Sequence, residues 1–262
     1  MISFSPVNSA GLQSAIDGLK RRNTGQTSLT NYFFQPMDRV RNLRMLESEK
    51  TICFSHDEWD FTRLYFWTFD AASLEQKLEA VRWPPLVVAD WISKTDTGAV
   101  GECLTKLGFH VHAIYDRIIC KSIRSERPNT HIRLANLSDR GPIHALLFQV
   151  FDKFADHIMP IDELGELIVQ EQVILSHDQQ DIIDGLVIFP IHGHSCNFNF
   201  LYNSGGSLSL AHLLGNFYGI LTERGVQSGF SWVRRTRPLV LKLHESFGWK
   251  KDGLVDRIYL RS

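Results

Sequence analysis

Side chains that could take part in catalysis are scattered along this chain and form no familiar catalytic motif. Two histidine pairs, His110 with His112 and His192 with His194, could each supply two metal ligands, but neither has further ligands at a recognisable spacing. The four cysteines stand apart among apolar residues, as buried reduced thiols do. No Gly-x-Ser-x-Gly, P-loop or dinucleotide-binding motif is present. The sequence therefore predicts no metal site and points away from serine hydrolases, P-loop NTPases and nicotinamide-dependent enzymes.

Four polar residues in the second half have types suited to holding a small polar molecule. Asn197 and Asn199 alternate along a strand-like run, but an amide cannot accept a proton at neutral pH. Asp156 and His157 stand in a turn and could orient an amine or a hydroxyl group. Residues of these types in a turn are also common as plain solvated loop residues, so neither pair identifies a reaction by itself.

The second half, which carries these residues, predicts ten elements in the order β-α-α-β-β-β-α-β-α-β. Apolar residues spaced by three and four from Ile143 to Val150 indicate one helix, for which Ser138-Asp139 is the expected N-cap. Pro238 is expected to begin the last helix and Gly248 to end it. Strands are expected at His131–Ala135, Val173–Ser176, Ile182–Phe189, Asn197–Tyr202, Val226–Val233 and Gly253–Arg261, and the other helices at Ile161–Glu171 and around Leu210–Ile220.

The end of the first half resembles the end of the second. Gly108–Ser122 (GFHVHAIYDRIICKS) and Gly248–Ser262 (GWKKDGLVDRIYLRS) share five identities without a gap. Each segment closes a stretch that reads strand, helix, Gly-aromatic turn, strand, and the offset of 140 residues is about half the chain. A repeat of this length indicates two copies of a domain rather than a solenoid. Before Leu86 the first half shows no full second copy.

The predicted fold is therefore a mixed α/β fold of two related lobes, of which the N-terminal one is degenerate. The polar, proline-containing run Ser125–Thr130 is a natural linker, so the lobes are expected at residues 1–124 and 130–262. A chain of 262 residues suits two domains of common size.

Composition argues against several kinds of partner. The formal net charge is −1, so no global basic field indicates nucleic acid. The N-terminus lacks the basic start and apolar run of a signal peptide, and the longest apolar runs, such as Gly185–Phe189, are too short to cross a bilayer. We therefore expect a cytoplasmic protein with no nucleic-acid or membrane partner, and a homodimer stays open.

The second half resembles the GNAT acyltransferase superfamily in its order of elements and in its tail. That family has the pattern Asn-x-x-Ala-x-x-Leu-Tyr-x-x-x-Gly-Phe where the last helix meets the closing strand. Leu243, Gly248 and Trp249 match this pattern, while Arg237 stands at the Asn position and His244 at the Tyr position.

A narrower resemblance is to the nucleotide-linked amino-sugar N-acetyltransferases, such as the dTDP-fucosamine enzyme. Phe151–Pro160 (FDKFADHIMP) is similar to their substrate-side region, with an aromatic residue, an Asp and an Ile-x-Pro at comparable places. This resemblance implies an amino sugar as the acceptor.

The superfamily resemblance implies an acyl-CoA co-substrate. Its thioester arm would lie between two splayed parallel strands, and its pyrophosphate on N–H groups where a loop enters a helix. The family's phosphate loop reads Gln/Arg-x-x-Gly-x-Gly/Ala; here Gly205, Leu208 and Leu210 stand at its anchor positions, and the leucines would crowd a pyrophosphate. A turn that only begins the helix is thus an alternative. The expected donor-binding residues are Leu201, Asn203, Gly205, Gly206, Ser207, Leu208 and Ser209.

The same resemblance gives His244 a catalytic role. The family's Tyr at this position lies near the thioester sulfur and is often assigned to protonate the departing thiolate, and an imidazolium with a pKa nearer neutrality could do the same. A histidine that only fills the space of the Tyr is the alternative. At the offset of 140 the first half has Leu104, which cannot transfer a proton, so no active site of this kind is expected there.

The family also places the remaining polar residues. Asp156 and His157 would lie in the region that covers the acceptor, and Asn197 and Asn199 beside the acyl channel, where they could hold a water that serves as base.

The sequence therefore predicts an acyl-CoA-dependent N-acyltransferase, with acetyl-CoA as the expected donor and a small-molecule amine as the acceptor. The amine would attack the thioester directly, and backbone N–H groups along the splayed strand would stabilise the tetrahedral intermediate. One alternative is a catalytically silent GNAT-like module for binding or assembly. Another is a transferase whose acyl group is carried by a carrier protein or a tRNA, although the near-neutral charge disfavours tRNA.

Overall fold

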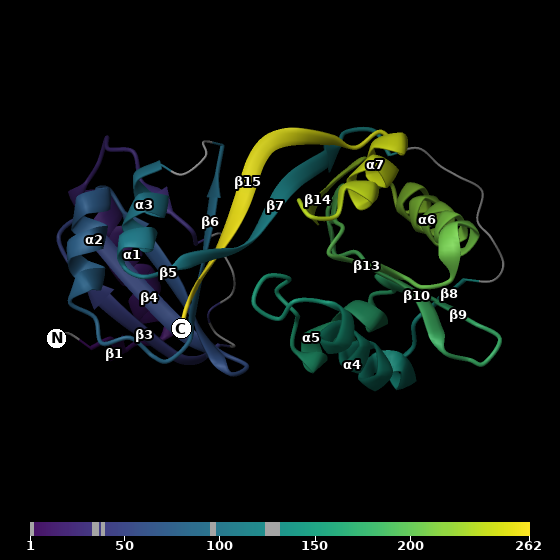
Figure 1. The fold of residues 1–262 in the computed structure, drawn as a ribbon, viewed down its shortest axis with the longest axis horizontal. Coiled ribbons are helices and arrows are strands. Elements are labelled where there is room, and N and C mark those ends of the chain that lie inside the picture. Colours follow the sequence, from purple (N-terminus) through teal and green to yellow (C-terminus); the bar gives the residue numbers. More distant parts are fainter. Residues whose placement is uncertain (1–2, 33–36, 38–39, 95–97, 124–131) are drawn as a thin grey trace. The chain divides into compact units, whose positions relative to one another are not determined.

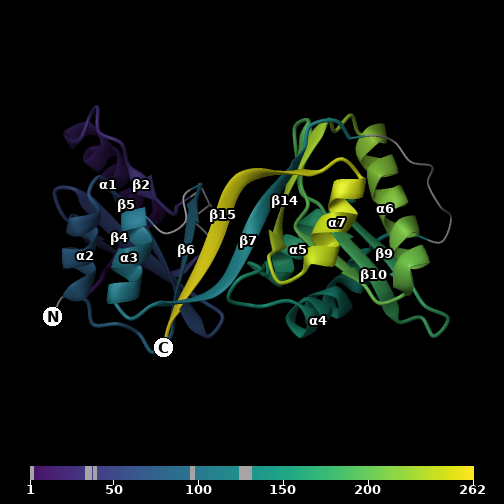
Figure 2. The ribbon, with the colours of Figure 1, turned by 45° about the horizontal axis from the view of Figure 1, so that its top comes forward.

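The structure, a computed structural model, describes residues 3–32, 37, 40–94, 98–123 and 132–262 (Figures 1 and 2). The chain forms two compact units, one made of Met1–Tyr115 with Leu254–Ser262 and the other of Asp116–Gly253. The expected linker, Ser125–Thr130, lies outside the described residues. Both units combine helices with β-sheet, which confirms the predicted mixed α/β class.

A mixed sheet forms the centre of the first unit. Its elements are β1 (Ser5–Pro6), α1 (Ser9–Arg22), β2 (Leu29–Thr30), β3 (Arg41–Glu47), β4 (Thr51–Glu58), β5 (Phe61–Thr68), α2 (Ala71–Glu79), β6 (Val87–Ser93), α3 (Gly98–Lys106), the start of β7 (His110–Cys120) and the end of β15 (Lys250–Arg261). Because successive side chains of a strand face opposite ways, each face of the sheet buries its own apolar set. One set, including Phe66, packs against α2 and α3; the other, including Phe54, packs against α1.

The second unit carries the elements predicted for the second half except the closing strand, and it adds η1 and β11. They are β8 (Arg133–Leu134), the 3-10 turn η1 (Leu137–Asp139), α4 (Arg140–Val150), α5 (Ile161–Val169), β9 (Val173–His177), β10 (Ile183–Ile188), β11 (Ile191–His192), β12 (Ser195–Asn197), β13 (Phe200–Asn203), α6 (Gly206–Glu223), β14 (Ser228–Arg234) and α7 (Pro238–Ser246). Strands pair in the order β13-β10-β9-β8, and separately β14 pairs with β12. Figure 1 shows α4 and α5 on one side of β10 and α6 on the other.

Two local predictions for this unit differ from the structure in detail. Asp139 does stand at the N-cap position of α4, but its side chain makes no capping hydrogen bond to that helix. The capping box lies one turn earlier, where Asn136 Oδ1 accepts the Ser138 N–H and Asp139 accepts the Asn136 N–H at the start of η1. The expected strand from Asn197 to Tyr202 is also interrupted, since its two parts pair with different strands.

The repeated Gly-aromatic segments build the same turn in both halves. Gly108 after α3 and Gly248 after α7 have φ angles of 85° and 86°, which glycine adopts without strain. The following N–H returns to the helix in each case: Phe109 donates to the Leu104 carbonyl at 3.0 Å, and Trp249 to the His244 carbonyl at 3.2 Å. Leu104 and His244 are therefore equivalent positions, as the sequence offset predicts.

The closing strand of the second copy completes the sheet of the first unit. Val255–Arg261 of β15 pairs antiparallel with Val87–Ser93 of β6. The closing strand of the second half therefore belongs to the first compact unit. The expected lobe limits at residues 124 and 130 stay a prediction. None of the helices described is both long and apolar enough to span a membrane.

Candidate functional site

Two parallel strands of the second unit diverge at Phe198. β12 pairs with β14 through Asn197, and the Phe198 N–H still donates to the Phe230 carbonyl of β14 at 2.9 Å. The next N–H, of Asn199, donates instead to the Ile188 carbonyl of β10 at 3.0 Å, and β13 continues along β10. The opposite edge of β13 has no partner strand within the described part of the chain. An extended ligand arm could pair with this open edge, as a peptide does in β-augmentation.

The two asparagines flank the point of divergence. Phe198, which lies between them in sequence, is buried beneath α6 and α7, where its ring contacts Phe217 and His244. Asn197 is half-buried and Asn199 is exposed, and their role in binding a substrate stays a prediction.

His244 lies in an aromatic cluster and is 2% exposed. Its ring stands edge-on to Phe198 at 5.2 Å and to Trp249 at 5.5 Å between centroids, and its buried Nδ1 has no hydrogen-bond partner among the described residues. Burial disfavours the charged ring and lowers the pKa of His244 to about 4. The expectation of a pKa near neutrality is therefore wrong. At pH 7 the imidazole is neutral, so it could offer the sulfur of a thioester donor a hydrogen bond rather than a labile proton.

The expected donor loop forms the exposed start of α6. Gly206 has a φ of 84°, and no side chain caps the first free N–H groups of the helix. Asn203 Nδ2 donates to the Gly206 carbonyl at 3.0 Å, while its buried Oδ1 has no partner in the described structure. Leu208 is 69% exposed. Ser207 is exposed, and Leu201 and Ser209 are half-buried.

Asp184, which sequence reasoning missed, lies against this loop. Its carbonyl accepts the Ser204 N–H at 2.8 Å, and Ser176 Oγ donates to its Oδ1 at 2.6 Å. A methyl group at Gly205 would come within 2.7 Å of Asp184 Oδ2 and 2.7 Å of Ser209 Oγ. A carboxylate thus stands at the N-terminus of α6, where the family resemblance expects a pyrophosphate. No local sequence signal marks it, because only the register of β10 against β13 brings it there.

Replacing Gly205 tests this close packing. We expect Gly205→Ala to lower the free energy of unfolding by about 1–2 kcal/mol, because the new methyl overlaps Asp184 and Ser209. Gly141→Ala in α4 is the matched control, since a methyl there meets nothing within 4 Å. Urea denaturation of both variants measures the difference; equal effects would contradict the crowding.

The loop after α4 is held by its own aspartates. Asp156 Oδ2 accepts the Asp152 N–H at 2.7 Å, and Asp152 Oδ1 accepts the Phe154 N–H at 3.1 Å. Arg234, the last residue of β14, donates to Asp152 Oδ2 at 3.3 Å. His157 has a φ of 47°, an uncommon backbone conformation for a non-glycine residue. Asp156 therefore has a structural role that the sequence does not reveal, and substrate binding by Asp156 and His157 stays a prediction.

The first unit contains a matching divergence, but its own chain fills it. β5 pairs with β6 only at Thr62 and Arg63. Along the rest of that edge, Asn31 Nδ2 donates to the Leu64 carbonyl at 3.0 Å and Asn31 Oδ1 accepts the Phe66 N–H at 2.7 Å. Thr30 and Leu29 of β2 then pair with Trp67 and Thr68. In the described part of the chain this edge of β5 is therefore occupied by residues 29–31, and the expectation that the first lobe is not an acyl-transfer site stays a prediction.

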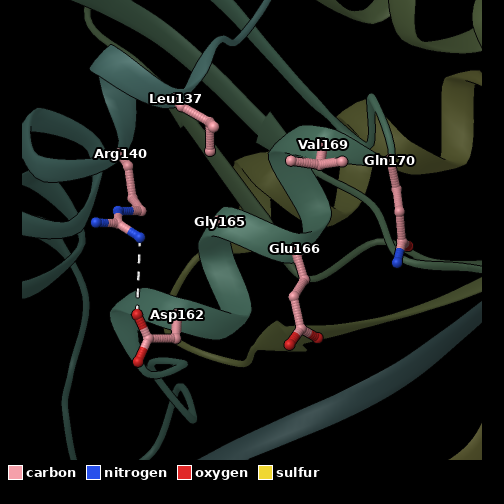
Figure 3. A pocket seen from close by; sticks show the side chains of 7 residues that line it. All are labelled: Leu137, Arg140, Asp162, Gly165, Glu166, Val169 and Gln170. Atoms are coloured by element: carbon pink, nitrogen blue, oxygen red, sulfur yellow. Dashed lines mark ion pairs between the residues drawn. The ribbon is translucent and has the colours of Figure 1, made fainter.

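A separate shallow cavity lies beside α5, and none of the expected site residues lines it. It measures about 330 Å³ and is lined from η1, α4 and α5 (Figure 3). Arg140 reaches across it to Asp162, with an N···O distance of 3.7 Å, and the apolar Leu137 and Val169 are largely exposed at its rim. The described residues contain no group of three His, Cys, Asp or Glu side chains that could hold a metal ion.

The chain is similar to known proteins in structure but not in sequence. No protein-family model matches the chain, and no curated protein is significantly similar to it in sequence. Solved structures match over nearly the whole chain at very low identity. A GCN5-related N-acetyltransferase from Sphaerobacter thermophilus gives a TM-score of 0.58 at 8% identity, covering 94% of this chain and 84% of that one. A tandem GNAT protein from the clavulanic acid biosynthesis pathway gives 0.57 at 10% identity, covering 98% and 97%.

The fold is that of the GNAT superfamily. A third structure, a GCN5-related N-acetyltransferase from Kribbella flavida, gives a TM-score of 0.55 at 12% identity, covering 97% of this chain and 95% of that one. The match to a tandem GNAT protein over both halves agrees with the predicted two-lobed architecture. The narrower likeness to amino-sugar acetyltransferases gains no support from these structures. Identities this low establish the fold alone, so the reaction of this GNAT-like chain has to be argued from its site.

Proposed function

We propose that the second unit transfers an acyl group from a thioester donor to the amine of a small molecule. The observation that carries this proposal is the open edge of β13 beside the divergence at Phe198. A pantetheine arm is an extended chain with amide groups, and it can pair with such an edge as a strand does. The thioester would then lie near Phe198 and His244, and the amine would approach from the face of Asn197 and Asn199.

The chemistry requires little from ionisable side chains. The neutral amine forms the new C–N bond, the C–S bond breaks, and the proton lost by nitrogen leaves through water held at Asn197 or Asn199 while the thiolate takes a proton from solvent. Because the N–H groups of Phe198 and Asn199 already donate within the sheets, the oxyanion would be stabilised by N–H groups on the open edge of β13. His244 contributes a polar edge to an otherwise aromatic wall. Acetyl as the acyl group and an amino sugar as the acceptor are finer proposals, as are a cytoplasmic site of action and a homodimer.

The residues present fit only part of acyl-CoA. The open edge of β13 suits the pantetheine arm. The start of α6 suits a diphosphate poorly, because the Asp184 carboxylate already stands beside Gly205. We therefore assign no step to the diphosphate.

Donor binding and hydrogen exchange together test the proposal. Acetyl-CoA should bind the full chain in calorimetry up to millimolar concentration, and the donor should slow amide exchange in Phe200–Asn203 of β13. The amides of β5 should be unaffected, because Asn31 and β2 already occupy its edge. Protection in β5, or the absence of protection in β13 at saturating donor, would refute the proposed site.

A catalytically silent binding module is the second candidate. The neutral, buried His244 and the carboxylate at the donor loop favour it, because both depart from what acyl transfer in this fold ordinarily uses. Mass spectrometry of a panel of primary amines incubated with the chain and a thioester donor separates the two. Acylated product from any amine supports the transferase, whereas donor binding without product from any amine supports the silent module.

A further inference from the structure

We propose that the donor site recognises the acylated pantetheine arm and gains no affinity from a diphosphate. The preferred donors are then thioesters of pantetheine or of 4′-phosphopantetheine, the form that carrier proteins present, rather than of CoA. This inference rests on the proposed function of the second unit and concerns which donor that site selects.

Asp184 is fixed where a diphosphate would otherwise be held. The Ser204 N–H bonds to its carbonyl at 2.8 Å and Ser176 Oγ to its Oδ1 at 2.6 Å, so neither its backbone nor its side chain is free to swing away without loss. Its Oδ2 faces Gly205 so closely that a methyl there would lie 2.7 Å from it.

The charges at the start of α6 add up to a site unsuited to a dianion. A helix N-terminus is equivalent to roughly +0.5 of an elementary charge, and one ionised carboxylate beside it more than cancels this. Residues 203–211 contain no Lys or Arg that could restore a positive potential. The free N–H groups of α6 thus face a local charge that is already negative.

The exposed surface at the start of α6 is apolar rather than cationic, whereas the start of α7 combines an exposed leucine with the exposed Arg235 and Arg237. Leu208 in the first turn of α6 is 69% exposed, and Leu239 in the first turn of α7 is 78% exposed. Exposed leucines suit the dimethyl group and methylene segments of pantetheine, and they offer nothing to phosphate oxygens.

Three donors that share the acetylpantetheine arm and differ in phosphate content, with an added adenosine in CoA, test the inference. Calorimetry should measure the Kd of S-acetylpantetheine, acetyl-4′-phosphopantetheine and acetyl-CoA for the full chain. S-acetylpantetheine should bind at least as tightly as acetyl-CoA, whose affinity should not fall as ionic strength rises. Acetyl-4′-phosphopantetheine, whose terminal phosphate carries about −1.5 to −2 charges at pH 7, should bind no more tightly than S-acetylpantetheine. Asp184→Asn should strengthen acetyl-CoA binding about fivefold, since one repulsive charge is removed, and should change S-acetylpantetheine less than about twofold. Asp181→Asn, at an exposed carboxylate in the β9–β10 turn, should change neither.

The outcomes separate this inference from the proposed function. Acetyl-CoA binding to wild-type protein more than about tenfold tighter than S-acetylpantetheine, with an affinity that falls as salt rises, would overturn the inference and leave the transferase intact. An equal effect of Asp184→Asn on both donors would also overturn it. Failure of all three donors to bind would overturn the proposed function itself. The salt series needs no variant, so it decides the question even if Asp184→Asn fails to fold.

Discussion

Lowering the pH from 7 to 5 is expected to cost the wild-type chain about 2 kcal/mol of unfolding free energy through His244 alone, and His244→Phe should abolish this cost. The folded pKa of His244 is about 4, well below the ordinary value of 6.5. Between these values the unfolded chain takes up a proton that the folded chain refuses, so acid favours unfolding. Phenylalanine preserves the aromatic packing against Phe198 and Trp249 and removes the titration.

The measurement is urea denaturation at pH 7, 6 and 5, compared as slopes against pH. Fitting the slightly larger phenyl ring can cost unfolding free energy, but a cost that does not vary with pH leaves the slope unchanged. His192→Gln serves as the control, because it removes an exposed histidine and leaves the aromatic packing around His244 in place. Parallel slopes for wild type and His244→Phe would mean that the ring is not desolvated as the structure places it.

The same histidine shows where sequence reasoning reaches its limit. The Gly-aromatic repeat correctly places His244 one turn before Gly248 and opposite Leu104 of the first half, because helix ends have local signals. The pKa of the ring depends on Phe198, which lies far away in sequence and whose burial follows from the break between β12 and β13. The position of His244 could be predicted from the sequence, and the pKa of its ring could not.

The candidate donor site likewise has features that the sequence predicts and features that it does not. The sequence predicts a strand, a glycine turn and a helix over residues 197–220, and the structure has them in that order. It does not reveal that Asn199 turns from β14 to β10, since the alternation of Asn and Phe from Asn197 to Phe200 continues across the break. Asp184 was missed because its approach to Gly205 depends on the pairing of Gly185 with Asn203, a register that no local pattern encodes.

Asn31→Ala is expected to destabilise the first unit by about 3 kcal/mol. Asn31 is 3% exposed, and its amide satisfies the Leu64 carbonyl and the Phe66 N–H at the point where β5 leaves β6. Alanine would leave both backbone groups buried without partners, and each such group costs about 1–3 kcal/mol. The Phe66 amide should then exchange with solvent much faster than in wild type. Gln76→Ala, which removes an exposed amide from α2, should change stability by less than about 0.5 kcal/mol.

This substitution also separates the roles of the two units. If the divergence in the first unit is only a remnant closed by Asn31 and β2, Asn31→Ala should leave donor binding to the second unit unchanged at temperatures where the chain stays folded. A second donor site appearing in calorimetry would show that the side chain of Asn31 alone keeps that edge shut. An unchanged Phe66 exchange rate would show that the edge of β5 is satisfied by something other than Asn31. The open edge of β13 in the second unit corresponds to the edge of β5 that Asn31 and β2 occupy in the first. Donor binding by Asn31→Ala measures how far this difference depends on the Asn31 side chain.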